Sequence, residues 1–303
     1  MDRRQFLAGV AAAAGTAMTA DAQVEFPPRP APPAVPPPVR PKVRLKQGLM
    51  RVVFGPDSKL TFDDQCREAA KIGFKGFDLI GQQEWPTLKK YGLVPTMAGA
   101  GPVSFQDGLI HKDVHDKLEP ALRAHIDMCA SHGVTNAISV GGQRRGMAEA
   151  EAADNAVAFL NRVKSHLEDK NVTLAIENMN HKYTEANFGR VDQIFAHPHW
   201  GFDVCRRVNS PRVKVLFDIY HAQVMAGDLV ATIRENIQWI AHFHTAGVPG
   251  RTDIDQTQEI NYRFVAQSIA DLGFTGYISH EFRPAPGHDP LDCIRQAYEI
   301  IDV

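Results

Sequence analysis

The chain has 303 residues, 44% of them hydrophobic, and 33 Lys and Arg stand against 35 Asp and Glu for a formal net charge of −2. A near-neutral chain offers no basic surface for a phosphate backbone, which argues against nucleic-acid binding. The length is enough for one large domain with a substantial core.

The first residues, MDRRQFLAGVAAAAGTAMTADAQ, have the features of an export signal. Arg3 and Arg4 precede a Phe-Leu pair, an alanine-rich apolar stretch and a small-x-small pattern at 20–22. This predicts a cleaved secretory signal over residues 1–22, similar to the twin-arginine type. The apolar stretch is too short and too rich in small residues to span a membrane comfortably. We therefore expect a periplasmic or otherwise exported protein with no stable membrane span after cleavage.

A proline-rich segment follows over residues 23–42 and holds nine of the chain's twenty prolines. Prolines have a fixed φ and no backbone donor, which favours an extended polyproline-type linker outside the core. The catalytic domain is expected over residues 43–303.

The remaining chain alternates short apolar runs with amphipathic stretches, a pattern typical of repeated β/α units. Eight strands are predicted, at 45–54, 76–80, 93–99, 136–142, 172–180, 213–221, 240–246 and 276–282. Eight such units in about 260 residues predict an α/β fold of the (β/α)8 TIM-barrel type, as a single domain. A doubly wound open sheet is the alternative, but VVFGPDSK after the first run is not the glycine-rich phosphate loop expected there.

The cysteines are far apart, form no CxxC pair and fall in predicted helices. Buried free thiols are the expectation, without a disulfide framework. They are Cys66, Cys129, Cys205 and Cys293.

Ionisable residues interrupt the last four predicted strands near their carboxyl ends, where TIM barrels place their chemistry. Because burying an isolated charge is costly, these interruptions need a shared explanation, and a divalent cation is the simplest. Three carboxylates and one imidazole with open water positions suit Mn²⁺, Mg²⁺ or Co²⁺ better than a structural zinc. The expected ligands are Glu177, Asp218, His244 and Glu281.

Side-chain alternation selects among the histidines. His242 and His244 face the same side of their strand, and His244 lies nearer the carboxyl end, so His242 is expected to be a packed, hydrogen-bonded core residue. His280 and Glu281 must face opposite ways, and Glu281 is chosen for the site because its strand supplies no other carboxylate. Taken singly, a carboxylate at a strand end is often a helix cap. His221, three residues after Asp218, could contact substrate or cap the next helix.

Three motifs, FDIYHAQVMAGD, HFHTAGVPGR followed by EINY, and GYISHEFRP, resemble the hydroxypyruvate isomerase group of the xylose isomerase-like sugar isomerases and epimerases. The resemblance covers roughly residues 45–300. It implies that Glu177 and Glu281 exchange protons with substrate and that Asp218 helps to hold the metal. It also implies that His221 contacts substrate oxygens, and it matches Arg251 to the arginine that closes VPGR.

The chain departs from the hydroxypyruvate isomerases at one ligand position. His244 stands where those enzymes tend to have Gln and where the sugar epimerases have a metal-binding His. After Glu177 the chain reads NMN, not the usual proline-containing continuation.

The predicted function is a metal-dependent isomerase or epimerase acting on a small keto-sugar or hydroxypyruvate-like compound through an enediolate. Glu177 and Glu281 are the expected acid/base pair, and His221 and Arg251 are expected to bind substrate oxygens. A keto-sugar or keto-inositol dehydratase could use the same residues, and a non-catalytic periplasmic sugar-binding barrel is a third interpretation. A nuclease of this fold would need more metal ligands and a basic face. The expected partner is a small carbohydrate or keto-acid substrate, and the sequence leaves homo-oligomer formation open.

Overall fold

The computed structural model describes residues 44–182 and 192–303. The signal expected over 1–22 and the linker expected over 23–42 therefore lie outside the described residues. The predicted domain over 43–303 is described almost throughout.

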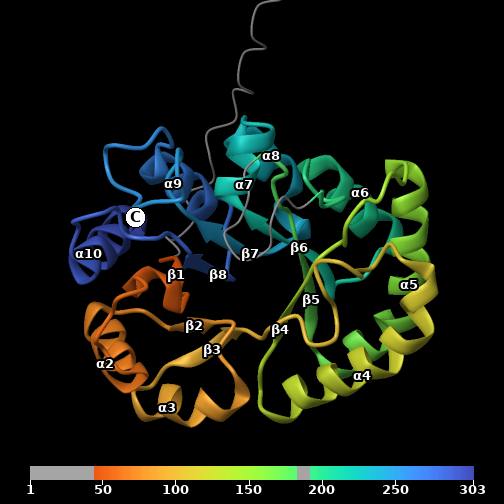
Figure 1. Cartoon of the computed structure of the whole chain (residues 1–303), viewed down its shortest axis with the longest axis horizontal. Coiled ribbons are helices and arrows are strands. Elements are labelled where there is room, and N and C mark those ends of the chain that lie inside the picture. Colours follow the sequence, from red (N-terminus) through yellow and green to blue (C-terminus); the bar gives the residue numbers. More distant parts are fainter. Residues whose placement is uncertain (1–43, 183–191) are drawn as a thin grey trace, which may run out of the picture. The chain divides into compact units, whose positions relative to one another are not determined.

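Eight parallel strands form one sheet in the order β3-β2-β1-β8-β7-β6-β5-β4. Its two edge strands meet at a parallel bridge between Ala98 and Ala137, so the sheet is a nearly closed barrel (Figure 1). The predicted TIM barrel is confirmed. The strands are β1 (Lys46–Leu49), β2 (Gly76–Asp78), β3 (Val94–Met97), β4 (Asn136–Ser139), β5 (Thr173–Glu177), β6 (Val213–Asp218), β7 (Ile240–Thr245) and β8 (Tyr277–His280).

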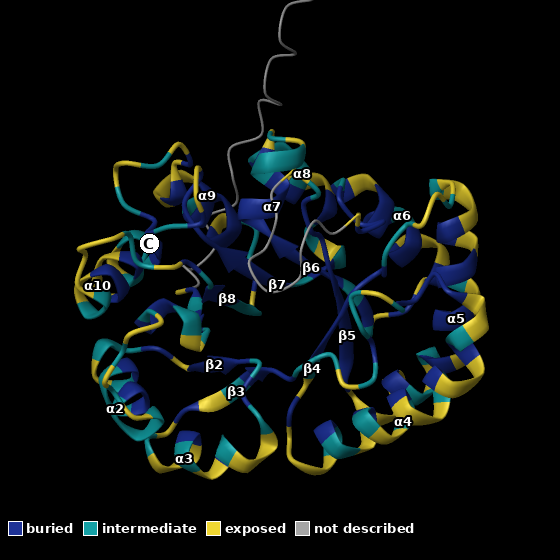
Figure 2. Cartoon of the chain, viewed as in Figure 1, coloured by how far each residue is buried: buried dark blue, intermediate teal, exposed yellow. Residues whose placement is uncertain are grey.

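Helices alternate with the strands and cover the outside of the barrel, with their exposed residues turned outward (Figure 2). The first of them begins with a capping box, in which Thr61 and Asp64 each bond the other's backbone N–H. The α-helices are α2 (Phe62–Ile72), α3 (Trp85–Lys90), α4 (His115–Ser131), α5 (Glu149–Lys170), α6 (Pro198–Val208), α7 (Ile219–Met225), α8 (Leu229–Asn236), α9 (Tyr262–Asp271) and α10 (Pro290–Ile301). Short 3-10 turns lie at Arg51–Phe54, Gln82–Glu84, Lys112–Val114 and Ile237–Trp239.

The apolar core has two parts. The larger part lies between the strands and the helices, as expected when helices cover the outside of a sheet. The smaller part fills the barrel interior with Met97, Ile138, Ala175 and Leu216. Because side chains alternate along a strand, the residues two positions beyond this layer also face inward, nearer the carboxyl-terminal end.

Several strands are shorter than predicted. The first ends at Leu49 instead of residue 54, since Arg51–Phe54 is a 3-10 turn. The sixth ends at Asp218 instead of residue 221, because the Asp218 side chain accepts the backbone N–H of His221 and starts α7. Apolar residues continue from strand into helix here, so hydrophobicity does not mark the boundary.

All four cysteines are free, buried and in helices, which confirms the expectation. Among residues 44–182 and 192–303, every helix is too short or too polar to cross a bilayer.

Candidate active site

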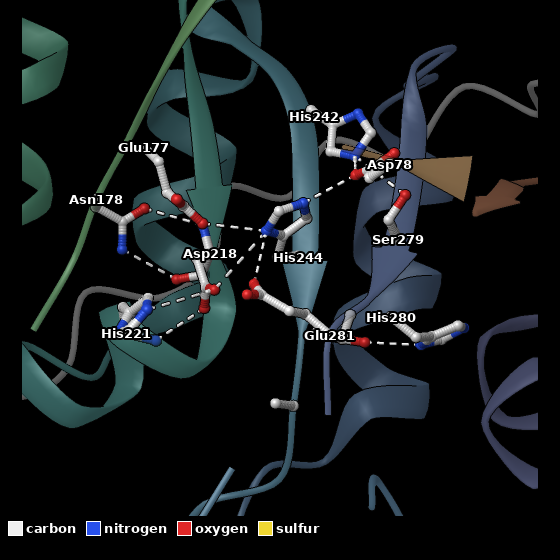
Figure 3. A network of polar contacts seen from close by, with 12 residues as sticks. Asp78, Glu177, Asn178, Asp218, His221, His242, His244, Ser279, His280 and Glu281 are labelled. Atoms are coloured by element: carbon white, nitrogen blue, oxygen red, sulfur yellow. Dashed lines mark hydrogen bonds and ion pairs between the residues drawn. The ribbon is translucent and has the colours of Figure 1, made fainter. Parts of the chain in front are cut away.

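Four ionisable side chains meet at the carboxyl-terminal end of the barrel (Figure 3). Each comes from a different β/α unit, and one potential ligand atom from each lies within 4.8 Å of the others. The residues are Glu177 at the end of β5, Asp218 at the end of β6, His244 in β7 and Glu281 just after β8. The structure therefore brings together the four residues that the sequence selected as metal ligands.

His244 lies at the centre of the cluster. Its Nδ1 atom is 3.1 Å from Oε1 of Glu177, 2.9 Å from Oε2 of Glu281 and 4.0 Å from Oδ2 of Asp218. All four side chains are largely buried. Three carboxylates so close together repel one another strongly when ionised, because little water screens them.

This crowding moves the pKa values of the four groups apart. Burial raises the pKa of Asp218 to about 8, and the charge of Glu281 adds to the effect. Burial likewise raises the pKa of Glu177 above its ordinary value. Burial acts against ionisation of Glu281 too, but the positive charges of Arg251 and His244 outweigh it and hold the pKa of Glu281 low. Burial also opposes protonation of His244, yet the surrounding carboxylates raise its pKa well above the ordinary value.

The NMN segment after Glu177 positions the neighbouring strand. The Asn178 side chain accepts the backbone N–H of Asp218 at 2.9 Å and donates to the Asp218 carbonyl at 3.0 Å. The Asn180 amide nitrogen lies 2.7 Å from Nδ1 of His221. These two asparagines, which the sequence identified only as a departure from the related enzymes, fix Asp218 and His221.

His221 is fully buried in the first turn of α7. Its Nε2 atom lies 3.7 Å from Oδ2 of Asp218 and makes no hydrogen bond among the described residues. Burial lowers the pKa of His221 well below its ordinary value, and the charge of Arg251 adds to this. A neutral imidazole at this position is suited to a polar contact with a neutral oxygen.

Arg251 lies inside the site, and its residue is only 8% exposed. Its Nη2 atom is 2.5 Å from Oε1 of Glu281 and 4.0 Å from Oδ2 of Asp218, and its guanidinium faces the ring of Tyr220. The residue has a left-handed backbone with φ of +58°, a conformation that costs free energy for any residue except glycine and is concentrated at functional sites. The turn after β7 thus directs a cation at the carboxylates.

The two remaining histidines lie as side-chain alternation predicts. His242 is fully buried and hydrogen-bonded, which confirms that part of the prediction. His280 faces away from the cluster, with its ring nitrogens 2.7 Å from Oγ1 of Thr245 and 3.0 Å from Oε1 of Gln47. Burial lowers the pKa of His280 to about 3, so it is a neutral structural residue.

Asp78 is part of this network, although the sequence analysis did not select it. It ends β2, and its Oδ2 atom is 2.7 Å from His242 and 2.9 Å from His244. The sequence signal for it is the same as in the last four strands, since an ionisable residue also ends this apolar strand.

The donor set fits a divalent cation. Oε2 of Glu281 is buried and makes no aligned hydrogen bond, although it lies close to His244. The Nε2 atom of His221 is also buried and makes no hydrogen bond among the described residues. Three carboxylates and one imidazole, with raised pKa values on two of the carboxyls, form a group whose mutual repulsion a bound cation would remove.

The family model of the xylose isomerase-like TIM barrels matches residues 66–301, which is most of the described barrel. The chain belongs to this family. Within the family, the chain is 28% identical over 160 residues to a putative hydroxypyruvate isomerase of Danio rerio, covering 52% of this chain and 55% of that one. It is 37% identical over 87 residues to a 2-oxo-tetronate isomerase of Cupriavidus necator, covering 29% of this chain and 33% of that one. The chain thus spans about half of one relative and a third of the other.

A longer match is to a 2-oxo-tetronate isomerase of Pectobacterium atrosepticum, 23% identical over 241 residues, covering 74% of this chain and 87% of that one.

Solved structures share the family's barrel at low sequence identity. An AP endonuclease of family 2 from Brucella melitensis superposes with a TM-score of 0.71 at 19% identity, covering 82% of this chain and 97% of that one. A D-allulose 3-epimerase from Methylomonas sp., in complex with D-allulose, superposes with a TM-score of 0.68 at 19% identity, covering 86% of this chain and 97% of that one. The IOLI protein with a zinc atom superposes with a TM-score of 0.64 at 17% identity, covering 84% of this chain and 96% of that one. At these identities the likeness shows the fold.

Proposed function

We propose that the protein is a metal-dependent isomerase or epimerase acting on a small α-hydroxy carbonyl compound, a keto-sugar or a hydroxypyruvate-like keto acid. The observation that carries the proposal is the cluster of two glutamates, one aspartate and one histidine at the carboxyl-terminal end of the barrel. The names of the sequence relatives, hydroxypyruvate isomerase and 2-oxo-tetronate isomerase, support this reaction class.

Glu177, Asp218, His244 and Glu281 are the residues that would hold the metal. A bound divalent cation would act as a Lewis acid that stabilises the negative charge developing on the substrate oxygens. Oxygen-rich ligation with one nitrogen supports Mn²⁺, Mg²⁺ or Co²⁺, and the zinc atom in the IOLI protein is a precedent for a divalent cation in a barrel of this shape.

Moving a carbonyl along a carbon chain, or inverting the carbon beside it, begins with removal of a weakly acidic C–H proton. One carboxylate must accept this proton and a second must return it at the other carbon or on the opposite face. Glu177 and Glu281 have pKa values displaced in opposite directions, which suits a pair with these two tasks.

Arg251 and His221 are assigned to the substrate's oxygens. The Arg251 guanidinium lies 2.5 Å from Glu281, nearer than the His244 ring at 2.9 Å. It can bind a substrate carboxylate by two parallel hydrogen bonds or donate to a terminal hydroxyl. His221 presents a buried ring nitrogen with no hydrogen-bond partner among the described residues, ready to contact a hydroxyl.

The test is to incubate the purified protein and Mn²⁺ with ketoses, 3-keto sugars and hydroxypyruvate, and to follow the products by NMR. The proposal expects one substrate to give an isomer or epimer, loss of conversion with a chelator, and recovery with fresh metal. An enone or diketone product would instead establish a dehydratase. Binding of sugar without conversion of any substrate would favour the binding protein.

Export is a separate proposal, which rests on the sequence pattern alone. If residues 1–22 are a twin-arginine signal, the full chain expressed in a bacterium will be found in the periplasmic fraction. Replacing Arg3 and Arg4 by Lys should retain the precursor in the cytoplasm, and unchanged export of this variant would contradict the assignment.

A further inference from the structure

Asp78 contacts two of the buried histidines, and it lies on the side of the His244 ring that faces away from the carboxylate cluster (Figure 3). The side chain is fully buried. Its Oδ2 atom lies 2.7 Å from Nε2 of His242 and 2.9 Å from Nε2 of His244, and its Oδ1 atom accepts the hydroxyl of Thr96. Both carboxylate oxygens are therefore held.

These contacts fix which nitrogen of His244 can offer a lone pair to a cation. An ionised carboxylate only accepts hydrogen bonds, so the Nε2 atom that faces Asp78 must carry the hydrogen. A histidine must be neutral to bind a metal, and in that form the other nitrogen, Nδ1, is the one without a hydrogen. That nitrogen lies 3.1 Å from Glu177 and 2.9 Å from Glu281, at the centre of the carboxylate cluster.

We infer that Asp78 is a positioning residue, which holds His244 through Nε2 so that Nδ1 is presented to the cation of the proposed metal site. The inference rests on the metal-dependent function proposed above and adds to it a residue from β2, a strand that supplies none of the proposed ligands. A carboxylate behind a metal-binding imidazole fixes the orientation of the ring and increases the basicity of the ligand nitrogen.

His242 helps to hold the Asp78 carboxylate in place. It shares Oδ2 of Asp78 with His244, and its Nε2 atom is also 3.1 Å from Oγ of Ser279. The two imidazole rings are nearly perpendicular, at 85°, with centroids 5.3 Å apart. His242 and Thr96 thus hold the two oxygens of Asp78 from different sides, which prevents the carboxylate from rotating away from His244.

The test is a double-mutant cycle on Mn²⁺ affinity, measured by calorimetry with the full chain. Asp78→Asn keeps the shape of the side chain but removes its charge, and we expect it to weaken Mn²⁺ binding by about 10- to 100-fold. His244→Gln keeps the three carboxylates but replaces the imidazole by an amide, so that Asp78 no longer has an imidazole ring to orient. In that background, Asp78→Asn should change the affinity by less than about threefold, because coupled residues are non-additive.

Two further variants separate loss of His244 orientation from a general loss of structure. Asp253→Asn removes another buried carboxylate that pairs with an imidazole, His288 at 2.5 Å, and should leave Mn²⁺ affinity unchanged. Thr96→Val removes only the hydroxyl that holds Oδ1 and remains informative if Asp78→Asn does not fold. It should weaken binding less than Asp78→Asn, and again only when His244 is present.

Equal weakening by Asp78→Asn with and without His244 would overturn the inference and leave the proposed function standing. A second Mn²⁺ per chain, lost in Asp78→Asn, would also overturn it, by making Asp78 and His242 ligands themselves. Absence of Mn²⁺ binding by the wild-type protein would refute the metal site and the inference together.

Discussion

At the residue scale, Asp218 shows how charge crowding links the site to pH. Burial and the charge of Glu281 raise the pKa of Asp218 to about 8 in the folded protein, against about 3.9 in an unfolded chain. Between these values the metal-free folded state binds more protons than the unfolded state. Its free energy of unfolding therefore falls as pH rises through this range, and the loss ends above pH 8.

A cation requires the ionised form of Asp218, so metal binding must release the proton. We expect the apparent Mn²⁺ affinity to rise between about pH 6 and pH 8, with protons released on binding. Calorimetry in buffers of different ionisation enthalpy measures both quantities. Asp218→Asn should lower the affinity and reduce its pH dependence. A wild-type affinity that does not change over this range would contradict the position of Asp218 in the metal site.

At the scale of secondary-structure elements, Asn178 joins the end of β5 to the end of β6. It forms two buried hydrogen bonds with the backbone of Asp218. Asn178→Ala leaves a backbone donor and acceptor without this partner and should lower the free energy of unfolding by about 1–3 kcal/mol. Urea denaturation measures this. Asn161→Ala, on the exposed face of α5, is the control and should change stability by less than about 0.5 kcal/mol. Equal effects of the two substitutions would show that the Asn178 contacts contribute nothing.

The order of elements could be predicted from the sequence because apolar runs and amphipathic stretches alternate over the whole barrel. Strand alternation also separated Glu281 from His280, and position along the strand separated His244 from His242, since both depend only on local backbone geometry. The ends of strands were less predictable. Asp218 turns the chain into α7 by capping it, and the sequence there stays apolar on both sides of the boundary.

Contacts across the barrel could not be predicted in the same way. The pairing of Arg251 with Glu281 depends on the left-handed backbone at Arg251. The contact of Asp78 with His244 joins residues 166 positions apart, which become neighbours only when the sheet curves into a barrel. Such contacts follow from closure of the sheet and not from any local pattern.

At the scale of the whole molecule, the nearly closed barrel and its helices bury all four thiols. Burial raises the pKa of Cys66, Cys205 and Cys293 to about 12 and that of Cys129 to about 11. A thiol that stays protonated is a poor nucleophile. The native protein should therefore release almost no chromophore from a disulfide reagent at neutral pH, whereas the denatured protein should release four equivalents. Rapid reaction of one native cysteine would show that a helix opens independently of the barrel.

In the proposed mechanism, two glutamates from different β/α units exchange protons with the substrate. The most direct measurement follows, by NMR in D₂O with Mn²⁺, the loss of the substrate's α C–H signal for wild type, Glu177→Gln and Glu281→Gln. Glu151→Gln, at an exposed position in α5, is the matched control. We predict exchange and turnover for wild type and control, and a loss of turnover of at least about 100-fold for each of the two site variants. Wild-type exchange and turnover in either site variant would contradict the two-glutamate mechanism.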